Sequence, residues 1–316
     1  MNRRNAGTVP RRLFLSSLLA AATTSAALIE DVRTSIDANN FGRAESYIQA
    51  YRAQHGVTPE LIEALSWIAR GRLARKEYDL AEKYARQTYD LATEQLRGRS
   101  LDQDRYLPIA LGAAIEVQAQ AMAAQGERAQ AVKYLRGELS KFASTSIRTR
   151  IQKNINLLSL EGRPAPPIQT SEFLGPRPPA LAAVRGKPVL LFFWAHWCGD
   201  CKAEVAALQR LMSTYGDRIV LIGPTQRYGY VAGGEEASPE AELKYIDAVR
   251  RQYYAPLANM PVPVSAEAFR TYGVSTTPTL VILDRAGVVR LYHPGAMTYE
   301  ELKRAVDRIL ARRATT

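Results

Sequence analysis

Apolar residues recur at helical spacing throughout the first half of the chain. Leu61, Leu65 and Ile68 show the pattern, because residues three or four positions apart lie on one face of an α-helix. The pattern is interrupted near residues 56–59 and 98–104 and again near Gly126. We therefore predict that residues 28–160 form an all-helical domain.

A short motif recurs within this region, in which a large residue is followed by alanine three positions later and by tyrosine six positions later. It occurs at Phe41, Ala44 and Tyr47, at Tyr78, Ala81 and Tyr84, and at Arg128, Ala131 and Tyr134. The motif resembles the second helix of tetratricopeptide repeats, but the alanines are 37 and 50 residues apart and the repeat has a period of about 34. Two interpretations stay open: a repeat domain whose concave surface binds a partner protein, and a plain helical bundle that acts as a spacer.

The character of the sequence changes after residue 160. Six prolines between residues 164 and 179 interrupt any helix and favour extended backbone. We predict a domain boundary near residue 160 and a proline-rich linker over residues 161–180. This linker leads into a second domain at residues 181–312.

Short apolar runs alternate with helical patterns in this second domain. Residues 189–194 and 218–223 are typical of buried strands, and residues 201–215 and 239–253 show helical spacing. A short helix at 266–272, strands at 279–283 and 288–292, and a closing helix at 298–312 complete the pattern. The order of elements predicts an α/β domain.

The N-terminus has the three parts of an export signal. Four arginines and no acidic residue lie in the first twelve positions, an apolar run follows over residues 13–22, and small residues end at Ala27. We predict a signal peptide over residues 1–27 and a periplasmic protein, exported by the Sec or the twin-arginine route. The apolar run is shorter than the roughly 20 residues that span a bilayer, so we expect no stable membrane span after cleavage. An uncleaved anchor in the inner membrane, with the protein facing the periplasm, is the alternative.

Composition and charge exclude other classes of protein. Apolar residues make up 47% of the chain and charged residues 23%, which is ordinary for a globular protein. Without the four arginines of the signal, the net charge of +11 becomes +7. Because lysines and arginines alternate with acids along the helices, we expect no nucleic-acid partner.

The only two cysteines of the chain, Cys198 and Cys201, lie where an apolar strand turns into a helix. At this spacing they can close a small disulfide ring, and the helix start favours the thiolate of the first. Zinc would need about four ligands, and the three histidines are scattered, so we expect no metal. Haem attachment needs histidine after the second cysteine, where this chain has Lys202. Two buried, unreactive cysteines are the remaining alternative, against which the polar residues between the cysteines argue.

The second domain resembles the thioredoxin fold, and residues 185–204 resemble the exported thiol-disulfide oxidoreductases of the TlpA/ResA type. The residues that carry the resemblance are Phe-Trp-Ala shortly before the cysteine pair, the cysteine pair itself, residues 272–274, and Thr277-Pro278-Thr279. The resemblance covers about residues 162–312. It implies a thioredoxin-like fold and a redox-active cysteine pair without a bound cofactor.

The resemblance also implies roles for single residues. Cys198 attacks a substrate disulfide and Cys201 resolves the mixed disulfide. Glu204 assists proton transfer, the alternative being an ordinary solvated glutamate. The peptide bond before Pro278 is expected to be cis, and Thr277, Pro278 and Trp197 to contact the substrate.

Other residues near the cysteines bear on the direction of electron flow. Phe192 occupies the position of a buried acid in thioredoxin and cannot relay protons. Asp200 disfavours a nearby thiolate and so favours a reductant. We expect His196 to be an exposed spectator, the alternative being a residue that stabilises the Cys198 thiolate. We expect Tyr228 and Tyr230 to lie in a mobile surface loop without function, the alternative being a loop that shapes partner choice.

The sequence thus predicts a thiol-disulfide oxidoreductase that reduces, or less readily oxidises, exported proteins. Its partners would be protein disulfides or dithiols and an upstream dithiol electron donor. In the resembling family the substrates include the cysteines of apocytochromes c. The alternatives are a non-catalytic binding scaffold and a peroxidase. Peroxidases of this fold have threonine and proline before the reactive cysteine, and this chain does not have them before Cys198.

Overall fold

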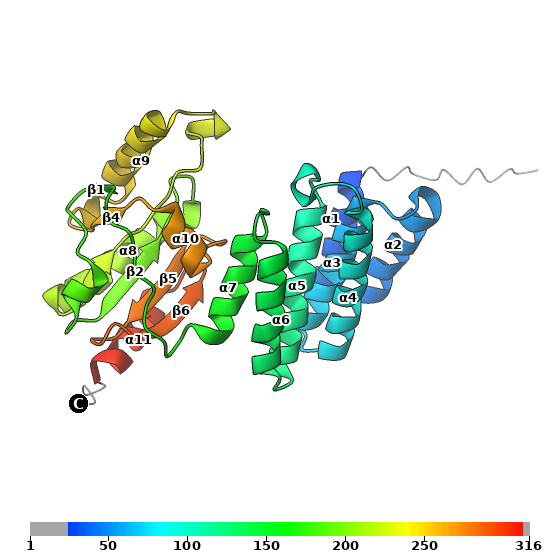
Figure 1. The fold of residues 1–316 in the computed structure, drawn as a ribbon, viewed down its shortest axis with the longest axis horizontal. Coiled ribbons are helices and arrows are strands. Elements are labelled where there is room, and N and C mark those ends of the chain that lie inside the picture. The colour runs from blue at the N-terminus through cyan, green and yellow to red at the C-terminus, as the bar shows by residue number, and fades with distance from the viewer. Residues whose placement is uncertain (1–24, 312–316) are drawn as a thin grey trace, which may run out of the picture.

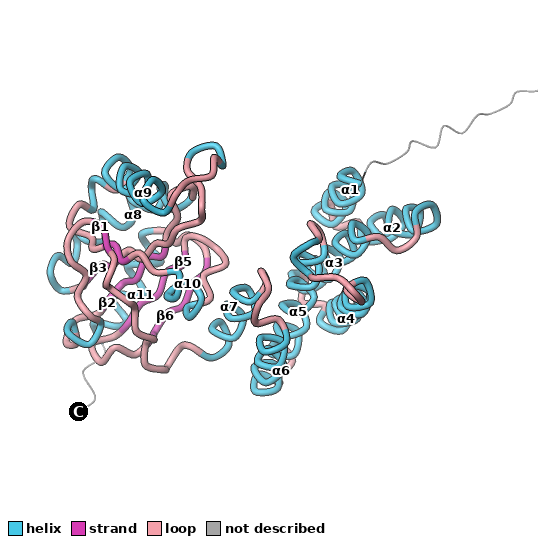
Figure 2. Tube along the Cα trace, turned by 45° about the horizontal axis from the view of Figure 1, so that its top comes forward, coloured by secondary structure: helices cyan, strands magenta, loops and turns pink. Residues whose placement is uncertain are grey.

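The structure is a computed structural model in which residues 25–311 are described. A helical part and an α/β part lie side by side and meet at helix α7 (Figures 1 and 2). The helical part contains α1 (Ser25–Asp37), α2 (Phe41–His55), α3 (Pro59–Ala74), α4 (Tyr78–Gln95), α5 (Leu107–Ala124), α6 (Arg128–Lys141) and α7 (Arg148–Ser159). The predicted signal peptide at residues 1–27 lies outside the described residues, except that residues 25–27 begin α1.

The helices of the first part pack in two layers. Helices α1, α3, α5 and α7 contact one another in chain order, and α2, α4 and α6 pack against them. Ala44, Ala81 and Ala131 occupy the same position in α2, α4 and α6 and are fully buried, as expected of small residues at helix contacts. The region is all-helical, as predicted. The tetratricopeptide interpretation stays a prediction.

Three helix ends in this part were not apparent from the sequence. The first falls at Asn39 and the second at Lys76, and both residues adopt a left-handed backbone conformation without being glycine. The third separates α6 from α7 at residues 142–147. The predicted breaks near residues 56–59 and 98–104 and near Gly126 all separate helices in the structure.

Helix α5 is apolar because it lies in the core of the helical part. It contacts α3, α4, α6 and α7, and most of its length is buried. Among residues 25–311 it is the one helix long and apolar enough to span a membrane by length and composition alone. Its burial against four other helices explains this composition.

The α/β part follows the predicted order of elements. Its main sheet contains β2 (Val189–Phe193), β3 (Val220–Ile222), β5 (Thr279–Leu283) and β6 (Val289–Pro294), and its helices are α8 (Gly199–Tyr215), α9 (Pro239–Tyr253), α10 (Ala266–Tyr272) and α11 (Tyr299–Ala311). The strand order is β3-β2-β5-β6, in which β2 and β3 are parallel and the other two pairs are antiparallel. Short 3-10 helices occur at Leu101–Gln103, Leu181–Val184, Gly216–Arg218, Ala232–Gly234 and Ala255–Leu257.

Both faces of the sheet are covered, which explains the unbroken apolar run of β2. Leu190 and Phe192 pack in a cluster with α8, α9 and α11, whereas Val189, Leu191 and Phe193 pack with α10. All five residues of β2 are therefore buried. Phe192 is part of this core, and its side chain has no titratable group with which to relay a proton.

Residues 161–180 pack along the α/β part. The backbone of Gly162 donates to Val289, that of Ala165 donates to Gly287, and the Tyr272 hydroxyl donates to the Pro166 carbonyl at 2.6 Å. A small antiparallel sheet of β1 (Phe173–Leu174) and β4 (Val262–Pro263) was not predicted, because two-residue strands leave no sequence pattern. The division of the chain near residue 160 stays a prediction, since α7 contacts both parts.

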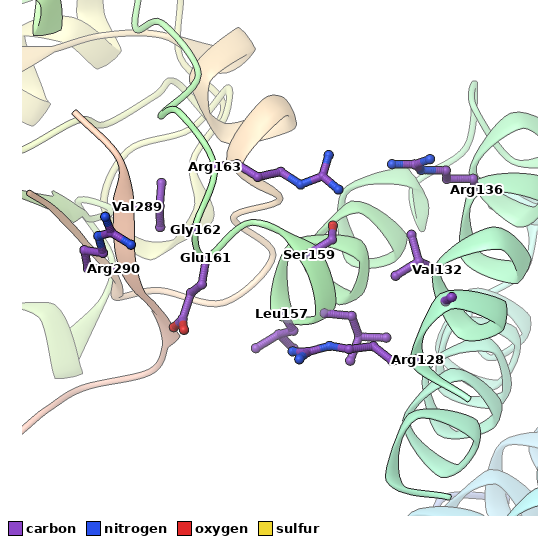
Figure 3. Close-up of a pocket in the computed structure, with 12 residues that line it drawn as sticks. Arg128, Val132, Arg136, Leu157, Ser159, Glu161, Gly162, Arg163, Val289 and Arg290 are labelled. Carbon is purple, nitrogen blue, oxygen red and sulfur yellow. The ribbon is translucent and has the colours of Figure 1, made fainter. Parts of the chain in front are cut away.

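The two parts meet through close backbone packing beside an open, charged pocket. The Asn156 side chain donates to the Thr271 carbonyl at 3.2 Å, which joins α7 to α10. The pocket has a volume of about 870 Å³, and Arg136 and Arg163 reach toward each other across it (Figure 3). Between the elements of the two parts, α7 packs chiefly against α10 and less extensively against β6.

We expect Gly273→Ala to weaken this packing. Gly273 has a left-handed backbone, and a Cβ there would lie 2.4 Å from the backbone nitrogen of Lys153. The left-handed conformation costs about 1 kcal/mol for a residue with a Cβ, and overpacking costs about 1–3 kcal/mol more. The free energy of unfolding, measured by chemical denaturation, should therefore fall by about 2–4 kcal/mol.

Gly287→Ala is the matched control, because Gly287 also has a left-handed backbone, but a Cβ there would meet no atom within 4 Å. It should cost only the conformational part, about 1 kcal/mol. Equal losses in the two variants would contradict a tight contact between α7 and the turn after α10.

Candidate functional site

The cysteine pair lies at the junction of β2 and α8. Cys198 is the N-cap residue of α8, with an extended backbone, and its sulfur accepts a hydrogen bond from the backbone N–H of Cys201 at 3.0 Å. The two cysteines form a disulfide. In the reduced protein, a thiolate at Cys198 would face the same N–H group and the positive end of the helix dipole, which stabilise negative charge.

Cys198 is less accessible than the sequence suggested. We expected it at the exposed end of the helix, but only 3% of the residue is exposed, and Cys201 is fully buried. Trp197, by contrast, is 49% exposed and lies directly before Cys198. Gly199 and Asp200, the first two residues of α8, are exposed, but both cysteines are buried.

The Thr277–Pro278 peptide bond is cis, as predicted. Thr279, the next residue, pairs with Phe193 at the end of β2. Because β2 and β5 are antiparallel, the start of β5 and the end of β2 lie at the same edge of the sheet. Thr277 and Pro278 therefore lie beside the segment that leads to Cys198; their contact with substrate stays a prediction.

Glu204 is buried on α8, one turn after Cys201. Only 4% of the residue is exposed, which contradicts the solvated alternative, and both carboxylate oxygens accept a hydrogen bond from the Met297 backbone at 3.1 and 3.2 Å. Burial, helped by the charges of Glu301 and Asp200, raises the pKa of Glu204 to about 7. A carboxyl group with this pKa exchanges protons readily near neutral pH.

The domain that carries this site matches a known family. The family described as thioredoxin-like domain matches residues 179–310. The C-terminal half of the chain is a thioredoxin-like domain.

Three relatives indicate which thioredoxin-like proteins this domain is similar to. The chain is 29% identical to the thioredoxin-like protein YneN of Bacillus subtilis over 148 residues, which is 46% of this chain and 79% of the relative. It is 27% identical to the thiol-disulfide oxidoreductase ResA of Geobacillus thermodenitrificans over 148 residues, 47% of this chain and 77% of the relative. It is 26% identical to the thiol:disulfide interchange protein DsbE of Xylella fastidiosa over 126 residues, 40% of this chain and 56% of the relative. The protein is therefore an oxidoreductase of the thiol-disulfide group.

His196 of the thioredoxin-like domain is buried, so the expectation of an exposed spectator was wrong. Its Nε2 lies 3.4 Å from Oε1 of Glu242, and each of the two residues is only 1% exposed. The His196 ring makes edge-to-face contacts with Tyr228, Tyr230 and Tyr245 at centroid distances of 5.3–5.6 Å. Burial lowers the pKa of His196, and the charge of Glu242 acts in the opposite direction.

The segment at residues 224–238 is also more ordered than the mobile loop we expected. The carboxylate of Glu242 accepts hydrogen bonds from the backbones of Tyr228 and Gly229, at 2.5 and 2.8 Å. Tyr230 forms an isolated bridge with Glu236. Sequence reasoning missed Glu242, because it lies 46 positions after His196 and its one signal is an acidic side chain near the start of α9.

Clusters of metal-ligating side chains are absent from the described residues of the thioredoxin-like domain. No group of three or more histidine, cysteine, aspartate or glutamate side chains is placed to hold a metal ion within residues 25–311.

We expect Glu204 to make the stability of the oxidised protein depend on pH. Its pKa is about 7 in the folded protein and near 4.5 when unfolded, so the folded state holds its proton more tightly. The stabilisation by that proton is complete below pH 4.5 and is lost as the pH rises to about 7. Relative to Glu204→Gln, the free energy of unfolding should fall by about 1–2 kcal/mol over this range.

Chemical denaturation of the oxidised proteins at several pH values measures this difference, since the disulfide does not titrate. Glu300→Gln, which changes an exposed glutamate, is the control and should leave the pH dependence of the wild type intact. Parallel pH profiles for wild type and Glu204→Gln would contradict a raised pKa.

Proposed function

We propose that the protein is an exported protein-disulfide reductase that acts by dithiol-disulfide exchange. The observation that carries the proposal is the placement of the Cys198 sulfur at the N-cap of α8, where the Cys201 N–H donates to it. This placement supports Cys198 as the attacking thiolate and the buried Cys201 as the resolving thiol.

In the proposed reaction, the Cys198 thiolate attacks one sulfur of the substrate disulfide. The substrate S–S bond breaks, a mixed disulfide forms, and the released substrate thiolate takes up a proton. Cys201 then loses its proton and attacks the Cys198 sulfur, which releases the second substrate thiol. Two electrons pass from the protein to the substrate. One proton comes from Cys201, and the other, which Cys198 lost on forming its thiolate, comes from solvent. An upstream dithiol protein restores the reduced pair.

Glu204 is the residue we propose to accept the Cys201 proton. It follows Cys201 by three positions on the same helix, so both side chains lie on one face. Its raised pKa keeps it ready to accept and return a proton near neutral pH. Because Phe192 has no titratable group, Glu204 would carry out the proton transfer that an acid at position 192 would otherwise perform.

The reductive direction rests on Asp200. Its carboxylate lies between the two cysteines in sequence and is exposed at the first turn of α8. A negative charge there disfavours the thiolate that must leave when the disulfide is reduced, which makes the disulfide the more stable form and the dithiol a reductant.

The remaining parts of the proposal concern place and partners. The predicted signal over residues 1–27 supports action in the periplasm, after cleavage or from an uncleaved anchor. For the helical part we propose that it holds a protein partner near the cysteine pair. Its regular layer of α1, α3, α5 and α7 supports this role, since stacked helical pairs present extended binding surfaces.

The mature protein should reduce insulin with dithiothreitol as electron donor, and Cys198→Ser should abolish the reaction. Ser213→Ala, at an exposed position on the same helix, is the control and should keep the wild-type rate.

Cys201→Ser should accumulate mixed disulfides with its substrates, because the resolving thiol is missing. An intact pair with no turnover would favour the scaffold alternative, and faster oxidation of a reduced protein than reduction of insulin would reverse the direction.

A further inference from the structure

The segment that follows β3 is held firmly against the site. At its start, Thr225 is fully buried, its hydroxyl donates to the Trp194 carbonyl at 2.9 Å, and its backbone pairs with that of Val264. Next, Arg227 forms a bidentate ion pair with Glu172, and its Nε donates to the Pro239 carbonyl at 2.9 Å. These contacts fix the backbone immediately before Tyr228.

Glu242 holds the next turn of the segment. Its buried carboxylate accepts the backbone N–H groups of Tyr228 and Gly229 and lies against the ring nitrogen of His196. A buried charge is costly unless hydrogen bonds satisfy it, and here two backbone donors do so. Glu242 thus connects the inserted segment, helix α9 and the turn that leads to Cys198.

The result is an aromatic surface beside the attacking sulfur. The rings of Trp197 and Tyr228 meet edge to face at a centroid distance of 5.4 Å, and His196 packs against Tyr228 at 5.6 Å. About half of Trp197 is exposed, and Tyr228 is partly exposed. Rigid aromatic rings offer a large contact area at little cost in conformational entropy, so they suit recognition of a protein segment.

We propose that Trp197 and Tyr228 form a recognition surface for an apolar or aromatic residue next to the reacting cysteine of a protein substrate. Tyr228 is then a specificity-determining residue, and Glu242 is a positioning residue that acts through it. The proposal rests on the proposed disulfide exchange at Cys198. Trp197 directly precedes Cys198 in the chain and contacts Tyr228, so the surface lies next to the residue that reacts.

Two substrates of different size separate this role from chemistry at the sulfur. Insulin presents a disulfide within a polypeptide, whereas the small aliphatic hydroxyethyl disulfide can reach Cys198 without a flanking chain or an aromatic ring. Tyr228→Ala should raise the KM for insulin about fivefold to tenfold and leave kcat within about twofold. At about 1.36 kcal/mol per tenfold this rise is about 1–1.4 kcal/mol, within the range of an aromatic contact. Turnover of hydroxyethyl disulfide should change less than about twofold, because it has no ring or apolar side chain to contact Tyr228. Tyr228→Phe keeps the ring and should behave as the wild type.

Glu242→Gln tests the positioning role. A glutamine amide presents one oxygen and an N–H₂ group to two backbone donors, so it cannot satisfy both as the carboxylate does. We expect the same selective rise of the insulin KM. Glu240→Gln, at an exposed position of the same helical turn, is the control and should leave both substrates unaffected. Thermal unfolding checks that each variant is folded. If Glu242→Gln does not fold, Tyr228→Ala alone tests the recognition surface.

The chemistry of the occupant is tested with two disulfide-linked peptide dimers that carry phenylalanine or serine next to cysteine. The wild type should reduce the phenylalanine peptide with the higher kcat/KM, and Tyr228→Ala should lose this preference. Equal reduction of both peptides by the wild type, or parallel losses on insulin and hydroxyethyl disulfide in Tyr228→Ala, would overturn the proposal. Failure of the wild type on every disulfide would instead overturn the proposed function on which it rests.

Discussion

The structure of the site depends on the cap that Cys198 provides to helix α8. A helix start leaves backbone N–H groups without intrahelical partners, and here the sulfur accepts one of them. Strand β2 leads into the segment that carries Cys198. Because β2 is buried on both faces, the position of its end is fixed. The same register that pairs Phe193 with Thr279 brings the cis-proline turn to this edge.

Around this cap, buried charges are arranged on two sides. Glu204 lies behind the cysteines on α8 and is held by the Met297 backbone, whereas Glu242 lies beside the turn before Cys198 and is held by two amides. The first is suited to proton exchange because burial raises its pKa. The second is satisfied by fixed backbone donors, which suits it to holding structure in place.

Much of the thioredoxin-like domain could be predicted because its signals are local. The apolar run of β2, the turn before β6 and the caps of α9 and α11 are encoded within a few residues each. The burial of His196, the role of Glu242 and the order of residues 224–238 could not be predicted, because they arise from contacts between residues far apart in the chain. In the helical part, Asn39 and Lys76 end helices without the usual glycine signal. The small sheet of β1 and β4 is set by tertiary pairing alone.

We propose that the helix cap makes Cys198, and not Cys201, the reactive thiol. The rate of alkylation of each cysteine in the reduced protein, followed by mass spectrometry with limiting iodoacetamide across pH, distinguishes the two thiols. We expect Cys198 to react first and to titrate below the value of about 8.5 for a free thiol. Equal or faster alkylation of Cys201, or a Cys198 that titrates at or above that value, would contradict it.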